Sequence, residues 1–173
     1  MNSPVSKIVV ALLLLACVSG AEAQEVGIIQ AVATVVSSMS VQGSHDLDFG
    51  AVTPGVPKSI DKATVGSAGE WQVTGASLAE VSVTFDLPPA LSHVSSGSTM
   101  PVSFNSTAAS FDDGSGSQIA PTGVINPNGP NVLNLGGSGE LWIWIGGTVT
   151  PAVSQTGGDY SADITMTVTY TGN

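Results

Sequence analysis

Two kinds of side chain in this sequence could take part in chemistry, namely two histidines and a set of carboxylates. His45 stands in a Gly-Ser-His-Asp turn, and His93 follows Pro88-Pro89. Nucleophilic hydrolysis needs a base beside a serine or cysteine and a third group that orients the base. No nucleophile-elbow sequence is present. The pattern therefore favours solvated loop histidines over catalytic ones, and we expect no enzymatic activity.

The carboxylates offer one candidate for a metal site. Asp112, Asp113 and Ser115 could supply oxygen ligands to calcium, but the spacing and the closing glutamate of an EF-hand loop are missing. An acidic turn explains the same residues, since aspartate is common in turns for backbone reasons. We favour the turn, expect no cofactor, and keep these three residues as the calcium candidates.

The N-terminal segment is typical of a secretory signal peptide. Lys7 precedes an apolar run at 8–18, and Ala21-Glu22-Ala23 forms a small-x-small cleavage site. Cleavage after Ala23 removes 1–23 and leaves 24–173, a length that suits one domain. Leu14-Leu15-Ala16-Cys17 resembles a lipobox, so lipid attachment at Cys17 is the alternative. The apolar run is too short to span a bilayer, and we expect no transmembrane segment after cleavage.

The charge and cysteine content of the chain exclude some classes of partner and some kinds of site. The formal net charge is −10, and only Lys58 and Lys62 are basic beyond the leader. A polyanion repels phosphate backbones, which excludes nucleic acid as a partner. Cys17 is the single cysteine, so the exported chain has neither a disulfide nor a cysteine-zinc site.

The residues after the leader indicate an all-β chain. The clearest strand is at 164–170, where Ile164, Met166, Val168 and Tyr170 alternate with threonines. Residues 141–145 are apolar on both faces, which predicts a central strand, and Gly146-Gly147 then suggests a bulge.

Shorter patterns predict further strands at 47–49, 81–87, 100–104 and 132–135, with 59–65 pairing with 70–74 across a glycine-rich turn. Residues 111–130 are rich in Gly, Ser, Asp, Asn and Pro and predict a long surface loop. About eight to ten short strands point to an antiparallel sandwich or barrel. Trp142 and Trp144 share one face of the central strand, and we expect them in the core rather than in an exposed stripe for sugars or partners.

Residues 24–41 are uncharged after Glu25 and rich in β-branched side chains, which favours a strand over a helix. The segment is long for one strand. It is either the first strand of its own sandwich or, over 24–36, an arm donated to another subunit. The residues that would enter the partner share large aliphatic side chains: Val26, Ile28, Ile29, Val32 and Val35.

Four stretches in order resemble a secreted bacterial family catalogued as domain of unknown function 4402. They are Asp46-Leu47-Asp48-Phe49-Gly50 with Pro54-Gly55, then Trp71-Gln72-Val73-Thr74-Gly75, Met100-Pro101-Val102-Ser103-Phe104, and the closing GGTVTPAVSQTGGDYSADITMTVTY at 146–170. The layout is more distantly similar to fimbrial subunits of the spore-coat-U type. The resemblance implies an immunoglobulin-like, pilin-like surface domain and transfers no catalytic residue, because the motifs are structural.

These observations predict a non-enzymatic structural or adhesive protein that is exported to the periplasm, cell surface or medium. One hypothesis is a fimbrial subunit that assembles by β-strand addition, with itself or other surface subunits as partners. The alternative is a monomeric binding module for glycan or matrix, with calcium dependence if the acidic turn binds the ion. An extracellular hydrolase is remote.

Overall fold

The computed structural model describes Gln30, Val32 and residues 38–172. The described fold belongs to the unit Val35–Asn173, and the two described residues of the unit Met1–Thr34 are both exposed. The predicted signal peptide at 1–23, with Cys17, lies outside the described residues, as does most of the predicted arm at 24–36.

The described residues form strands and no helix, which confirms the all-β prediction. The strands are β1 (Ser40–His45), β2 (Lys58–Ile60), β3 (Gly69–Thr74), β4 (Glu80–Asp86), β5 (Ala90–His93), β6 (Thr99–Ser103), β7 (Ala109–Asp112), β8 (Gly123–Ile125), β9 (Asn131–Asn134), β10 (Glu140–Ile145), β11 (Gly147–Val149), β12 (Tyr160–Ser161) and β13 (Thr165–Tyr170).

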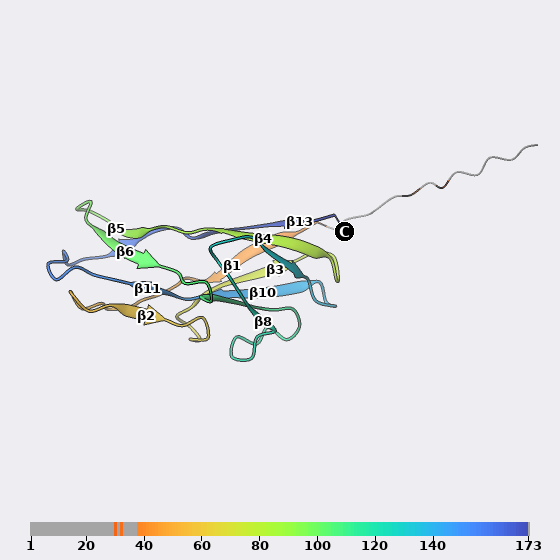
Figure 1. Ribbon diagram of the computed structural model, residues 1–173, viewed down its shortest axis with the longest axis horizontal. Helices are drawn as coiled ribbons and strands as arrows, with labels where there is room; N and C mark the ends of the chain where they lie inside the picture. The colour runs from red at the N-terminus through yellow and green to blue at the C-terminus, as the bar shows by residue number, and fades with distance from the viewer. Residues whose placement is uncertain (1–29, 31, 33–37, 173) are drawn as a thin grey trace, which may run out of the picture. The chain divides into compact units, whose positions relative to one another are not determined.

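These strands make three antiparallel sheets, visible in Figure 1. The first sheet has the order β1-β3-β10-β7-β8, the second β12-β5-β6-β11-β2, and the third β13-β4-β9. The first and third sheets share the main apolar core, in which Val73 and Ile143 meet Val81 and Val83. This arrangement is consistent with a β-sandwich, in which each sheet buries one face against the other.

The central strand of the first sheet is β10, between β3 and β7. Leu141, Ile143 and Ile145 are fully buried in the main core, as the apolar run predicted. At Gly146 the chain leaves the first sheet and continues as β11 of the second. Only glycine fits there, since a Cβ would collide with the carbonyl oxygen of Ile60.

The closing strand β13 confirms the predicted alternation. Met166 is buried and Val168 half-buried against the main core, while Thr165, Thr167 and Thr169 are exposed. The strand pairs along its whole length with β4. Its last residue, Tyr170, accepts a hydrogen bond on its hydroxyl from the amide of Ala76 at 2.8 Å.

A second, smaller cluster of buried residues lies among the strands of the second sheet. Phe49, Met100, Val102 and Val149 form it, and Phe104 packs against this cluster and the main core alike. The core is therefore made of two connected parts.

The predicted hairpin of 59–65 with 70–74 is wrong. The strand β2 pairs with β11, and β3 pairs with β1 and β10. The residues between them form turns, with the amide of Thr64 bonded to the carbonyl of Asp61 and the amide of Ala68 to that of Thr64. These turns carry the chain from one sheet to the other, so the two segments cannot pair.

Three smaller expectations also need correction. Residues 47–49 form no strand, although Phe49 is buried. Residues 111–130, predicted as loop, contain the end of β7 and all of β8. The described strands outnumber the expected eight to ten, partly because β4 and β5, β10 and β11, and β12 and β13 are consecutive strands that belong to different sheets.

Candidate functional site

The described part of the chain contains a groove of about 1110 Å³. Its walls are the 45–54 loop and the 155–165 segment, and its floor is the smaller core cluster. The floor residues share large apolar side chains: Leu47, Phe49, Leu91, Met100, Val102 and Phe104. One part of the hydrophobic core thus opens directly into the groove.

Strand edges that no other described strand pairs with border this opening. The first sheet ends at β1, the second at β12 and the third at β13. Gly43 and His45 of β1 and residues 160–165 line the groove. Every residue of β1 is exposed, and Val41, which pairs with buried Val73, still has 40% of its surface exposed. A strand edge of this kind carries backbone N–H and C=O groups that can pair with another chain.

The rim of the groove is acidic. Asp46, Asp48, Asp159 and Asp163 are exposed and line it, and neither of the described lysines does. Asp48 also shapes the rim, because its Oδ1 accepts a hydrogen bond from the amide of Gly50 at 2.7 Å. The rim disfavours an acidic ligand, while the floor favours an apolar one.

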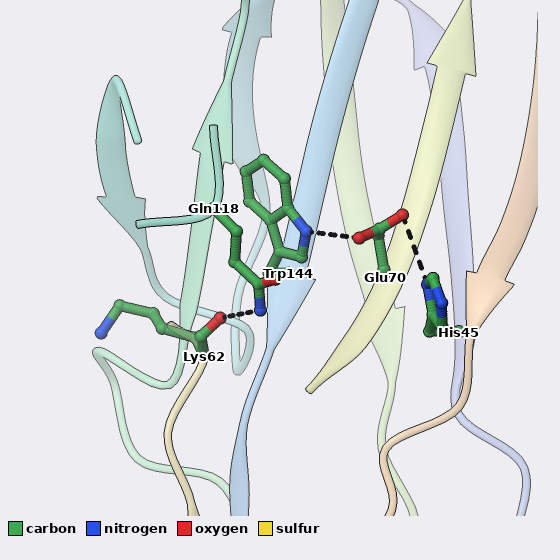
Figure 2. Close-up of polar contacts among 5 residues, drawn as sticks. All are labelled: His45, Lys62, Glu70, Gln118 and Trp144. Atoms are coloured by element: carbon green, nitrogen blue, oxygen red, sulfur yellow. Dashed lines mark hydrogen bonds and ion pairs between the residues drawn. The ribbon is translucent and has the colours of Figure 1, made fainter. Parts of the chain in front are cut away.

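His45 lies at the C-terminal end of β1, where the register with β3 shifts. Figure 2 shows its contact with Glu70: the His45 Nδ1 atom is 3.6 Å from Oε1. The other carboxylate oxygen, Oε2, accepts a hydrogen bond from Nε1 of Trp144 at 2.8 Å. His45 thus faces a carboxylate across the β1–β3 pair, beside the groove.

His93 has a structural role in the turn after β5. Its Nδ1 accepts hydrogen bonds from the amides of Ser95 and Ser96, and its Nε2 lies 3.1 Å from the carbonyl oxygen of Gly157. The imidazole also packs edge-on against the ring of Tyr160, with the ring centroids 5.0 Å apart. The prediction of a solvated loop histidine is wrong for His93, which is the last residue of β5, pairs with Tyr160 and is half-buried. Its contacts with Gly157 and Tyr160 fix one wall of the groove.

The three calcium candidates lie away from the groove lining: Asp112 is the last residue of β7, and Asp113 and Ser115 follow it in the next turn. The Oδ1 atom of buried Asp112 accepts hydrogen bonds from three successive amides, those of Gly114, Ser115 and Gly116, at 2.8–3.0 Å. Burial alone would raise the pKa of Asp112, but these amides together with the Thr122 hydroxyl outweigh it and hold the pKa below its usual value.

The neighbouring Asp113 accepts a hydrogen bond from the Thr122 hydroxyl at 2.7 Å. Residues 38–172, with Gln30 and Val32, contain no group of three His, Cys, Asp or Glu side chains placed to hold a metal ion. The turn is therefore closed by its own amides and hydroxyls, and calcium binding at Asp112, Asp113 and Ser115 stays a prediction.

The two tryptophans lie on the face of the first sheet that points away from the main core. Trp144 is 1% exposed and Trp142 half-buried, and their rings are stacked with centroids 6.5 Å apart. The loop between β7 and β8 covers them, since a Cβ at Gly116 would be 3.0 Å from Nε1 of Trp142. Gln118 ties this loop to the carbonyl of Lys62 by a 2.8 Å hydrogen bond (Figure 2).

Trp144 is buried, as predicted. Neither tryptophan, however, lies in the main core between the first and third sheets. The segment that covers the tryptophans belongs to the stretch 111–130, which the sequence predicted to be a surface loop. We name residues 113–122 the covering loop, and the surface beneath it the tryptophan face.

Sequence reasoning did not find the groove. Leu47 and Phe49 read as a short strand, and Met100, Val102 and Phe104 as one side of another. Nothing in a local pattern shows that these side chains share a floor that other strands leave open. Of the predicted arm residues only Val32 is described, and 88% of its surface is exposed. Val26, Ile28, Ile29 and Val35 lie outside the described residues.

The sequence model of a family described as domain of unknown function (DUF4402) matches residues 39–170. The match runs from the residue before β1 to the last residue of β13, so it includes the whole groove. No curated protein matches the chain. Among the described residues no helix has the length and apolar character needed to cross a membrane.

Proposed function

The chain belongs to the DUF4402 family, and we propose that it is an exported, non-enzymatic structural or adhesive surface protein. In this proposal it is a pilin-like subunit with an immunoglobulin-like sandwich, and it assembles by β-strand addition. Residues 24–36 are the strand that one subunit donates to the next.

One observation carries the proposal. The smaller core cluster opens into the groove beside three strand edges that have no neighbour among the described strands. Covering an aliphatic side chain stabilises a complex by roughly 1.5–3 kcal/mol before ordering costs. A strand that buries several of its own aliphatic side chains on this floor gains that term several times and also satisfies the free backbone groups of the edge.

Export rests on the leader, and its test is direct. We expect the intact mass of the exported protein to correspond to a chain that begins at Gln24. A mass that shows lipid on Cys17 at the new N-terminus would instead make the protein membrane-anchored.

Assembly is tested by negative-stain electron microscopy and by sedimentation of the exported protein at rising concentration. We expect filaments or a ladder of oligomers from the full chain. Removal of 24–36 should abolish them and leave a folded subunit that binds an added peptide with the sequence of 24–36. A full chain that stays monomeric at high concentration, together with a shortened chain that unfolds, would assign the segment to its own domain and refute the proposal.

A further inference from the structure

We propose that the groove of one subunit binds residues 26–36 of a second copy, added as a strand along the free edge of β12 and β13. In this arrangement Ile29, Ala31, Ala33 and Val35 face the groove floor. The inference rests on the proposed function and adds the acceptor site, the edge used and the face of the arm that enters.

The free edge of β12 and β13 lies beside the groove. The partner of β12 is β5 and the partner of β13 is β4, and the other side of each strand has no neighbour among residues 38–172. Residues 160–165 of this stretch line the groove directly. Segments 160–170 and 26–36 are equal in length, so one can run beside the other from end to end.

The chemistry of the groove selects this occupant. An apolar floor inside an acidic rim favours a segment that is apolar on one face and carries no negative charge. Residues 26–44 contain no Asp, Glu, Lys or Arg. In a strand, alternate residues share a face, and the odd-numbered positions 29, 31, 33 and 35 are all apolar. The even-numbered face carries both polar residues of the arm, Gln30 and Thr34, beside aliphatic ones. We place this face on the solvent side because it is the one that contains polar side chains.

The position of the arm's origin points to a second copy. The chain enters β1 at Ser40, which pairs with Thr74, close to the end of the sandwich where the Tyr170 hydroxyl binds Ala76. The groove is lined by the opposite ends of these strands, at His45, Gly69 and Thr165. The start of β1 and the groove therefore lie at opposite ends of this strand. A contact between the arm of one copy and the groove of the next is head-to-tail in this proposal, so it need not close and can build a filament.

The test uses engineered cysteines, because the exported chain has none of its own once residues 1–23 are removed. One exported chain, residues 24–173, carries Ala31→Cys in the arm, and a second carries Leu47→Cys in the groove. The two proteins are mixed and treated with a short bismaleimide, and covalent dimers are measured on a denaturing gel. The control replaces Leu47→Cys by Val124→Cys, which is 53% exposed on β8 and outside the groove.

We expect dimers from the arm and groove pair, and about tenfold fewer from the arm and β8 pair. A second substitution in the arm sharpens the test. Ile29→Asp, which buries a charge, should lower the yield of covalent dimers by about tenfold or more. Gln30→Asp, its neighbour on the solvent face, should lower that yield much less.

Three results would overturn the inference. Equal cross-linking to position 124 would place the arm elsewhere. A single chain with both cysteines that cross-links internally at low concentration, and gives no mixed dimer, would show that the arm occupies its own groove. Filaments that form without cross-linking at position 47 would leave strand-mediated assembly standing and reject this groove, whereas the absence of both filaments and dimers would reject the proposed function itself.

Discussion

Two apolar surfaces of this protein differ in what covers them. The tryptophan face of the first sheet is closed by the covering loop of the same chain, and Trp144 beneath it is 1% exposed. The groove floor also holds apolar side chains, and Leu47, Leu91 and Phe104 on it are only half-buried among the described residues. The cover over the tryptophans is held by specific hydrogen bonds at Asp112 and Gln118.

The difference separates two uses of apolar surface. Where the chain supplies its own cover, the buried area contributes to the stability of the subunit. Where it does not, the same kind of area remains available to a partner, as exposed apolar patches often are. Substitutions on the tryptophan face should therefore change folding, and substitutions in the groove should change assembly.

The largest effect is expected at Trp144. Trp144→Ala removes a fully buried side chain and the hydrogen bond to Glu70, so it should lower the free energy of unfolding by about 3–5 kcal/mol. Leu47→Ser in the groove should cost much less, because Leu47 is only half-buried, but should suppress oligomers. Urea unfolding and sedimentation measure the two effects. Equal destabilisation by both substitutions would remove the contrast between the surfaces.

The sequence predicted elements whose burial is set within one strand. The alternation of Met166, Val168 and Tyr170 and the apolar run of β10 gave the correct faces, because side-chain direction repeats every two residues. The carboxylate of Asp112 acts locally on the amides of the turn that follows, but Asp112 itself is the last residue of β7 rather than part of the predicted turn.

The predictions that failed concern features set by contacts between residues distant in sequence. The pairing of β2 with β11 rather than β3 joins residues on opposite sides of the 61–146 segment. The cover over Trp142 and the opening above Leu91 are likewise set by which strands and loops come together. A local pattern reports that a face is apolar and does not report which segment, or which molecule, lies on it.

The second-largest effect tests whether β13, the strand beside the groove, is stably folded in the isolated subunit. Val168 faces the main core from β13, the strand beside the groove, so Val168→Asp should cost about 2–4 kcal/mol. Thr167→Asp, one residue away and exposed, should be far milder. Thermal unfolding of the two variants compares them. Similar losses would mean that β13 is not held by its own core and gains its order only on assembly.

The third effect concerns the covering loop. Asp112→Ala removes the acceptor of three amides, two of them on exposed residues, and should cost about 1–3 kcal/mol. Because the pKa of Asp112 is lowered in the folded state, the unfolded chain binds this proton more readily. The contribution of the carboxylate is present above the unfolded-state pKa and is lost as the pH falls below about 4.

Asp112→Asn is the matched control, since it keeps an oxygen acceptor but cannot titrate. Chemical unfolding at neutral pH and at stepwise lower pH should show a smaller acid loss in this variant than in the wild type. An unchanged acid dependence would show that the loop is held by contacts other than this carboxylate. It would also weaken the view that the tryptophan face has a fixed cover.

The smallest effect is expected at Ser110, which lies opposite Trp144 in the register of β7 and β10. It is fully buried, and its hydroxyl is the one buried side-chain polar atom without a hydrogen-bond partner among the described residues. A buried hydroxyl without a partner opposes folding, so Ser110→Ala should leave stability unchanged or raise it by up to about 1 kcal/mol. Ser59→Ala is the control, because the Ser59 hydroxyl bonds that of Thr148 at 2.7 Å and its loss should be slightly unfavourable. Differential scanning calorimetry of both variants gives the comparison. A clear loss of stability at Ser110→Ala would mean that the hydroxyl has a partner in solution, such as an ordered water under the covering loop, and that the tryptophan face is less completely sealed than its contacts indicate.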